Sequence, residues 1–201
     1  MIEADIADRL NLSRTPVRGA LQRLEREGYV RSVGSRARSR MVVSPLTRED
    51  VAELYAIIGH LEGLGARNTA ALEEGTRLKV ADRLTRLNKV LSTLARARRA
   101  EPNRIFETDL EFHRTILRAA AGPRLLEMHD AIQPQVERYW RLYSGAIVDE
   151  LSHSVNEHEQ IISALREGDA DAAEKGLQVN WMKGLERLSR VIDSLGERGN
   201  W

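Results

Sequence analysis

Three side chains in the second half of the chain, Asp109, His113 and His158, could bind a metal ion or carry out acid–base chemistry. Asp109 and His113 are four residues apart, so in a helix they lie on one face. That face continues through Ile116 and Leu117, and His158 also falls on an apolar stripe, so we expect all three to point inward. Buried polar groups of this kind need partners. They therefore form either a metal site or a hydrogen-bonded polar core, and one carboxylate with two imidazoles suits a first-row divalent ion.

A second kind of chemistry is indicated by the arginines of the first 48 residues. This segment holds ten Arg and Lys against five Asp and Glu, whereas the remainder holds 21 basic and 25 acidic residues. A basic segment suits the phosphate groups of nucleic acid, and a mildly acidic one does not. We therefore expect the first segment to contact nucleic acid; the alternative is a chance clustering of surface arginines.

The elements that must position these residues are mostly helical. The spacing of apolar residues predicts two short helices, over 2–10 and 14–27, joined by a polar turn. Two β-prone runs, 29–33 and 41–43, flank a basic segment and predict a hairpin, or wing. After Pro45, breaks at Gly and Pro separate six amphipathic segments, which predict an antiparallel helical bundle: about 48–72, 76–100, 102–120, 123–143, 147–167 and 169–195. The expected fold class is thus mainly α, with a small winged head and an all-helical body.

The composition excludes several classes of protein. The chain has no cysteine, which rules out disulfides and thiolate metal sites. No apolar stretch approaches the roughly 20 residues that cross a bilayer. The first residues lack the basic and then apolar pattern of a signal peptide. We therefore expect a cytoplasmic protein without a membrane partner.

Residues 12–30, LSRTPVRGALQRLEREGYV, closely resemble the helix-turn-helix signature of the GntR family of bacterial transcriptional regulators. The resemblance implies a winged helix-turn-helix DNA-binding domain over 1–46, whose second helix enters the major groove with its N-terminal end. Heads of this family usually begin with one more helix, which we expect this head to lack. The resemblance and the basic wing together assign the DNA contacts to eight residues: Ser13, Arg14, Thr15, Arg18, Arg23, Arg36, Arg38 and Arg40.

Residues 47–195 resemble the FadR-type C-terminal domain of the same family, called FCD. The specific matches are the segments 109–116, DLEFHRTI, and 157–169, EHEQIISALREGD. The resemblance implies an effector-binding and dimerisation domain over 47–201. In metal-binding FCD domains an Asp-x-x-x-His pair meets two further histidines, whose positions here hold His158 and Asn180. The implied metal site therefore consists of Asp109, His113, His158 and Asn180, with zinc, nickel or manganese as the ion.

Asn180 stands where metal-binding members have a histidine. A neutral amide oxygen is a poorer ligand, so this residue either weakens the site or leaves a position open for water or for an effector carboxylate. The alternative remains a polar core, in which Asp109 pairs with His113 or His158 and no metal binds.

The effector pocket also departs from the pattern of the family. Many FCD members have an arginine at position 58, where it pairs with the carboxylate of the effector, but this chain has Ile58. Other side chains must then hold a small organic acid. We expect them among six residues: His60, Arg67, Arg114, Arg138, Tyr139 and Trp181. The remaining histidines, His129 and His153, are expected at the surface or behind the metal ligands.

These observations predict a DNA-binding transcriptional regulator whose affinity for double-stranded operator DNA is controlled by a small carboxylate metabolite. A homodimer is expected, because one head reads only half of a palindromic operator. Two alternatives are a dimeric adaptor that does not bind DNA and a metal-dependent hydrolase built on Asp109, His113 and His158. The hydrolase is disfavoured, because the spacing of Glu111 and Glu159 turns these carboxylates away from the metal-binding face.

Overall fold

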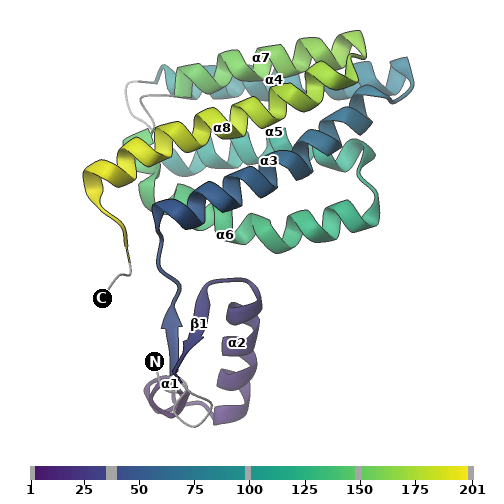
Figure 1. Cartoon of the computed structure of the whole chain (residues 1–201). Helices are drawn as coiled ribbons and strands as arrows, with labels where there is room; N and C mark the ends of the chain where they lie inside the picture. Colours follow the sequence, from purple (N-terminus) through teal and green to yellow (C-terminus); the bar gives the residue numbers. More distant parts are fainter. Residues whose placement is uncertain (1–2, 35–39, 98–100, 148–150, 199–201) are drawn as a thin grey trace. The chain divides into compact units, whose positions relative to one another are not determined.

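The computed structural model describes residues 3–34, 40–97, 101–147 and 151–198. The chain divides into two compact units. One contains the residues up to Thr47 together with the C-terminal residues from Glu197, and the other is Arg48–Gly196. We call them the head and the body and describe each by itself (Figure 1).

The C-terminal residues belong to the head, whereas the sequence placed them with the body. The reason is an antiparallel bridge between Leu46 and Arg198. The N–H of Leu46 donates to the carbonyl oxygen of Arg198 at 2.7 Å, and the N–H of Arg198 donates back at 3.2 Å. Arg198 is therefore paired with Leu46, in the last part of the head.

The head contains two helices and a hairpin: α1 (Glu3–Leu10), α2 (Arg14–Arg26), β1 (Val30–Val33) and β2 (Arg40–Val43). Val17 and Leu21 of α2 are buried and pack with Ala7 of α1 to form a small core. Gly28 ends α2 with a φ of +76°, which lets the N–H of Tyr29 bond back to the last turn of the helix. The expected helix-turn-helix is therefore present.

The expected wing is also present as a two-stranded antiparallel hairpin. Val30 lies opposite Val43 in its register, and Val30 is buried. Arg40 begins β2 and is exposed. Two of the expected DNA contacts, Arg36 and Arg38, lie in the segment 35–39, outside the described residues.

The body is a bundle of six helices: α3 (Arg48–Ala70), α4 (Glu74–Ala95), α5 (Pro102–Ala120), α6 (Pro123–Ile147), α7 (Leu151–Glu167) and α8 (Ala170–Leu195). In Figure 1, α8 lies along α3 and α7 lies along α4, in agreement with the contacts between these helices. The described residues thus form eight helices and one two-stranded sheet, which confirms the mainly α fold class.

The helix ends follow local sequence signals in most places. The carboxylate of Asp169 accepts a hydrogen bond from the N–H of Ala172 at 2.9 Å and caps α8. Pro102 occupies the first turn of α5, where a missing N–H does no harm. The sequence predicted that α6 ends at about 143, but the helix continues to Ile147. A single glycine inside a helix, here Gly145, costs only about 1 kcal/mol and therefore does not end it.

The core of the body lies where α5 and α7 face each other and the neighbouring helices. Its members are almost completely buried: Leu84, Phe112, Ile116, Ile161, Leu165 and Leu177. Phe112 and Ile116 are four residues apart on α5, and Ile161 and Leu165 are four apart on α7, which fixes the inward face of each helix. His113 and His158 lie on those same faces and are consequently buried with the core.

The surroundings of two glycines predict that substitution by alanine has opposite effects on stability at the two positions. Gly168 ends α7 with a φ of +74°, and an added Cβ would lie 2.8 Å from the guanidinium of Arg77. Gly19 is inside α2 and an added Cβ would meet nothing within 4 Å. We expect Gly168→Ala to lower the free energy of unfolding by about 1–2 kcal/mol, because of the left-handed backbone. Gly19→Ala should raise it by up to about 1 kcal/mol through helix propensity.

Denaturant unfolding followed by far-ultraviolet circular dichroism would measure both effects. Equal stability of the Gly168→Ala variant and the original protein would contradict the account of the α7 terminus.

Candidate functional site

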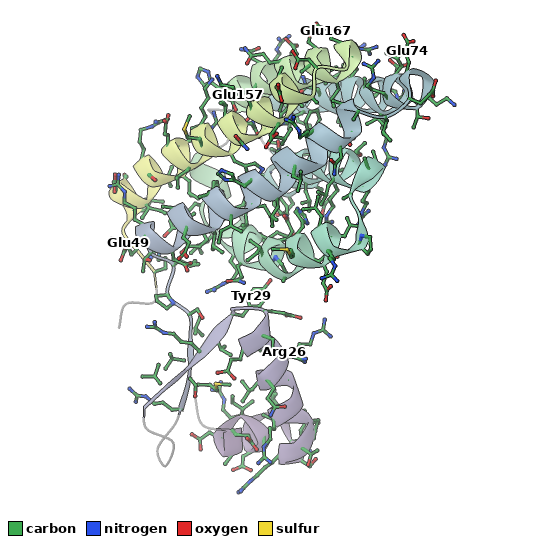
Figure 2. The ribbon with its side chains drawn as sticks, turned by 45° about the vertical axis from the view of Figure 1, so that its right-hand side comes forward. Arg26, Tyr29, Glu49, Glu74, Glu157 and Glu167 are labelled. Carbon is green, nitrogen blue, oxygen red and sulfur yellow. The ribbon has the colours of Figure 1, made fainter. Side chains whose placement is uncertain are left out.

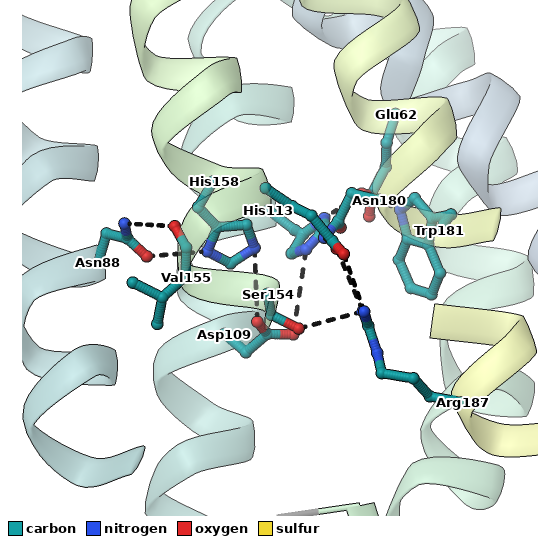
Figure 3. Close-up of polar contacts among 11 residues, drawn as sticks. Glu62, Asn88, Asp109, His113, Ser154, Val155, His158, Asn180, Trp181 and Arg187 are labelled. Atoms are coloured by element: carbon teal, nitrogen blue, oxygen red, sulfur yellow. Dashed lines mark hydrogen bonds and ion pairs between the residues drawn. The ribbon is translucent and has the colours of Figure 1, made fainter. Parts of the chain in front are cut away.

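Asp109, His113 and His158 come together inside the body (Figure 3). Asp109 and His113 project from α5, and His158 projects from α7. One ligand atom from each of the three lies within 4.8 Å of the others. Oδ1 of Asp109 is 3.6 Å from Nε2 of His158, and Oδ2 is 4.0 Å from Nε2 of His113. The structure therefore groups the three residues that the sequence singled out.

The orientation of the His158 ring is set by Asn88 of α4. The amide N–H of Asn88 donates to the carbonyl oxygen of Val155 at 3.0 Å, so its amide oxygen faces Nδ1 of His158 at 3.2 Å. Nδ1 therefore carries the proton, and Nε2 is a bare acceptor directed at Asp109. Phe112 stacks on the ring at 3.8 Å between centroids. Burial lowers the pKa of His158 well below its usual value, so the ring is neutral.

His113 is held from the other side by the buried carboxylate of Glu62, on α3. Nδ1 of His113 donates to Oε2 of Glu62 at 2.5 Å, which leaves Nε2 facing Asp109. Glu62 also accepts hydrogen bonds from Nε2 of His129 at 2.9 Å and from Nε1 of Trp181 at 2.7 Å. One carboxylate thus anchors side chains from three other helices.

The charges of Glu62 and His113 shift each other's pKa. Burial opposes ionisation of Glu62, but the charges and hydrogen bonds of His113 and His129 prevail and lower its pKa to about 2. Burial likewise disfavours the protonated ring of His113, yet Glu62 raises the pKa of His113 to about 9. Burial raises the pKa of Asp109. His113 is therefore protonated near pH 7, and its Nε2 proton lies on the side of the ring that faces Asp109.

The arrangement of the three residues suits a divalent cation. Neither Asp109–His113 nor Asp109–His158 is within hydrogen-bonding distance. Nε2 of His158 is buried and has no hydrogen-bond partner among the described residues. A buried acceptor normally has a partner. A metal ion would bind this nitrogen, and Glu62 and Asn88 already orient the two rings from behind, as supporting groups do in metal sites.

Asn180, on α8, lines the same cavity as Asp109 and His113. Its amide N–H donates to Oε2 of Glu157 at 2.8 Å. This bond assigns the amide nitrogen to Glu157, so only the amide oxygen is left to act as a ligand.

The cavity has a volume of about 70 Å³, and we call it the body cavity. Besides the residues already named, its wall contains aromatic side chains and a second polar group of residues: Tyr55, Phe106, Trp140, Gln133, Ser154 and Arg187. Arg187 is buried and its guanidinium contacts both oxygens of Glu157, at 2.9 and 3.2 Å. Glu62, Gln133 and Arg187 were not predicted as site residues. Their signal in the sequence was a place on the inward face of a helix, and this pattern does not distinguish a polar residue of a cavity wall from a residue of the core.

Of the six residues expected to hold the effector, Trp181 alone lines the body cavity. Arg67 forms exposed ion pairs with Asp171 and Glu174, and Arg114 pairs with Glu137. These carboxylates hold both arginines outside the cavity, and for them the expectation is corrected.

The other three candidates are also elsewhere. His60 is exposed, with Nδ1 2.7 Å from the carbonyl oxygen of Ala56. Tyr139 is buried, and its hydroxyl donates to Asp50 at 2.6 Å. Arg138 is half-buried and is not part of the cavity wall. Sequence spacing gave their helices but not the neighbouring helix that each side chain meets.

The two remaining histidines differ from each other. His129 is buried behind His113, through their shared partner Glu62, so it is not a surface residue. His153 is exposed. The sequence did not decide for either residue between the surface and a position behind the metal ligands, and the structure gives a different answer for each.

The expected DNA-contacting residues of α2 are exposed around its N-terminal end: Ser13, Arg14, Thr15 and Arg18. The guanidinium of Arg18 contacts the carboxylate of Glu3 at 2.9 and 3.0 Å, and Arg23 contacts Glu27 at 2.7 Å. Figure 2 shows the side chains of the head, with Arg26 labelled at the opposite end of α2. Exposed ion pairs of this kind are weak, so both arginines remain able to exchange their partners for phosphate.

Comparison with known families agrees with this architecture. The model of the FCD domain matches residues 53–179, and the model of winged helix-turn-helix DNA-binding domains matches residues 4–31. The first match begins within α3 and ends within α8, just before Asn180, and the second covers most of α1, all of α2 and the start of β1.

Individual relatives are regulators. The chain is 30% identical over 179 residues to the "Probable D-xylose utilization operon transcriptional repressor" of Paenarthrobacter nicotinovorans, covering 87% of this chain and 73% of that protein. It is 26% identical over 184 residues to the "Gluconate operon transcriptional repressor" of Bacillus licheniformis, with coverage of 89% and 72%. The solved structure of E. coli McbR/YncC has a similar fold, with a TM-score of 0.68 at 19% identity over 94% of this chain and 86% of that one.

Within the described part of the chain, no helix combines the length and apolar character needed to cross a membrane. The matching domains and relatives are those of regulators rather than enzymes, which removes the hydrolase alternative. Both halves of the fold, the signature of α2 and the FCD match lead to one conclusion. This chain belongs to the GntR family of transcriptional regulators, in the branch whose C-terminal domain is an FCD domain.

Proposed function

We propose that this regulator binds double-stranded operator DNA as a homodimer in the bacterial cytoplasm, and that a small organic acid bound with a divalent metal ion in the body cavity changes its affinity for DNA. The observation that carries the proposal is the buried convergence of Asp109, His113 and His158, in which Nε2 of His158 has no partner among the described residues. A dimer follows from the two-fold symmetry of operators, in which each head reads one half-site.

The head supplies the parts needed for DNA binding. The N-terminal end of α2 presents Arg14 and Thr15 to solvent, beside the free N–H groups of the first turn. An arginine there can reach guanine edges or phosphate, and a hydroxyl suits phosphate oxygens. Arg40 on β2 extends the basic surface toward the wing.

The body supplies the ligands for a metal ion. Asp109, His113 and His158 would hold zinc, nickel or manganese, with the amide oxygen of Asn180 as a weaker fourth ligand. A bound ion would offer a Lewis-acidic position to a carboxylate. Two neutral imidazoles and one carboxylate leave a divalent ion with a net positive charge, which favours an organic acid as the effector.

DNA binding should depend on Arg14. Sites selected from a random duplex library would serve as probes, and affinity would be measured by fluorescence anisotropy over a series of salt concentrations. We expect Arg14→Ala to weaken binding to the best site about tenfold or more, since a base contact contributes about 1–3 kcal/mol. Arg26→Ala, at the other end of α2, is the matched control and should have a smaller effect. A wild-type protein without salt-sensitive, sequence-preferring binding would refute the proposal for the head.

Metal binding should stabilise the body. At 100 times its dissociation constant, a metal adds about 2.7 kcal/mol to the free energy of unfolding, which raises the melting temperature by several degrees. We expect chelation to lower the melting temperature and one of zinc, nickel or manganese to restore it. His158→Ala should abolish the shift, whereas His153→Ala, which removes an exposed histidine from the same helix, should retain it. An unchanged melting temperature in every condition would show that the three residues form a polar core.

Metal affinity should also rise with pH. The pKa of His113 is about 9 without metal, so below this pH a metal ion must displace a proton from Nε2. One displaced proton makes the apparent affinity increase about tenfold per pH unit between pH 6 and 8, with a plateau above about pH 9. Calorimetric titration in buffers of different ionisation enthalpy would count the released protons. An affinity independent of pH across this range would exclude His113 as a ligand.

A further inference from the structure

Arg187 is a buried cation whose function is not explained by packing. It lies on α8, seven residues after Asn180 and therefore on the same helical face, and it lines the body cavity. Its guanidinium contacts both oxygens of Glu157 and donates to the hydroxyl of Ser154 at 3.1 Å. A buried ion pair is no more stabilising than a well-packed apolar pair. The position of this pair at a cavity wall therefore indicates a ligand.

The held guanidinium still has hydrogen-bonding capacity. A guanidinium carries five N–H groups. The contacts with Glu157 and Ser154 engage NH1 once and NH2 twice. Nε–H and one hydrogen of NH1 remain, on opposite edges of the guanidinium, so one of them can bind the carboxylate of a ligand. Figure 3 shows a dashed line from the guanidinium of Arg187 to Ser154, beside Asp109. A cation that is already oriented binds a carboxylate with little loss of conformational freedom.

Gln133, on α6, contributes a second unsatisfied group to the same wall. Its side chain is 5% exposed, and its amide oxygen is buried without a hydrogen-bond partner among the described residues. A buried acceptor without a partner is rare in folded proteins. A hydroxyl group on a ligand would satisfy it.

The size of the cavity limits the ligand. A cavity of about 150 Å³ accommodates benzene. The body cavity, at about 70 Å³, holds roughly half as much, which suits a carboxylate group with one or two further carbons. Phe106 and Trp140, which stack at 4.5 Å between centroids, give its wall an apolar portion for the carbon chain.

We propose that Arg187 and Gln133 form the anchor of a short hydroxy acid of two or three carbons, with the guanidinium receiving its carboxylate and the Gln133 amide oxygen its hydroxyl. This inference rests on the proposed function, because it names the class of effector for the body cavity. It does not require that the metal ion be present. Arg187 replaces Arg67, Arg114 and Arg138, which do not line this cavity, as the binding residue for an organic anion.

The test is calorimetric titration of glycolate, acetate and citrate into the full chain, once loaded with zinc and once after chelation. Glycolate and acetate differ by one hydroxyl, and citrate is too large for the cavity. We expect glycolate to bind at least tenfold more tightly than acetate, and citrate to bind more weakly than either. Gln133→Leu should bind glycolate and acetate equally, with the affinity for acetate unchanged.

The contribution of Arg187 is tested with the double variant Arg187→Gln, Glu157→Gln, which removes both charges and leaves no lone buried carboxylate. It should bind glycolate and acetate at least tenfold more weakly than the wild type, and still bind zinc. Arg67→Gln, which removes an exposed arginine outside the cavity, is the matched control and should bind as the wild type does. Circular dichroism and the melting temperature would verify that each variant is folded.

The outcomes separate this inference from the metal proposal. Zinc binding without any glycolate binding would overturn the inference and leave the metal site standing. Glycolate binding that depends on Arg187 and Gln133 in a protein that binds no zinc would support the inference and refute zinc as the ion of the metal site. Equal affinities of the wild type for glycolate and acetate, or wild-type affinity in the double variant, would overturn the inference.

Discussion

The buried carboxylate of Glu62 is the interaction on which the site depends. It projects from α3 and accepts hydrogen bonds from His113 on α5, His129 on α6 and Trp181 on α8, so that one side chain connects four helices. Such a group is costly to bury unless every lone pair is satisfied, and here the donors lower the pKa of Glu62 to about 2. Because Nδ1 of His113 is bound to Glu62, Nε2 must face Asp109. The orientation of the site therefore follows from the packing of the bundle.

A second buried carboxylate orients side chains in another part of the cavity wall. Glu157 on α7 holds Asn180 and Arg187 of α8. Oδ1 of Asp109 and Nε2 of His158 face each other at 3.6 Å without a hydrogen bond. The bundle thus pairs the charges of Glu62 and Glu157 internally, and the proposed metal ion and organic acid would bind beside the side chains that these two carboxylates orient.

Asn180 and Arg187 both lie on α8, whose last residues lead through Gly196 into the segment that pairs with Leu46 of the head. The chain therefore connects body and head twice, at the start of α3 and after the end of α8. Glu62 lies on the first of these helices and Arg187 on the second. A ligand that alters the packing of α3 against α8 acts on both connections, which is a physical route by which a regulator of this family can respond to an effector.

Much of this protein is determined by local sequence alone. The helical periodicity, the Gly and Pro breaks and the signature around Arg14 gave the mainly α fold, the hairpin and the inward faces of α5 and α7, because these depend on residues close together in the chain. The spacing of Asp109 and His113 on one turn of helix is local for the same reason. Only the tertiary structure decided which helices meet at the cavity. It added Glu62, Gln133 and Arg187 to the cavity wall and excluded Arg67, Arg114 and His60 from it. The partner of a polar side chain on an amphipathic helix is often a residue of another helix, 30 residues away for Arg187 and 51 to 119 residues away for Glu62, and helical spacing carries no information about that neighbour.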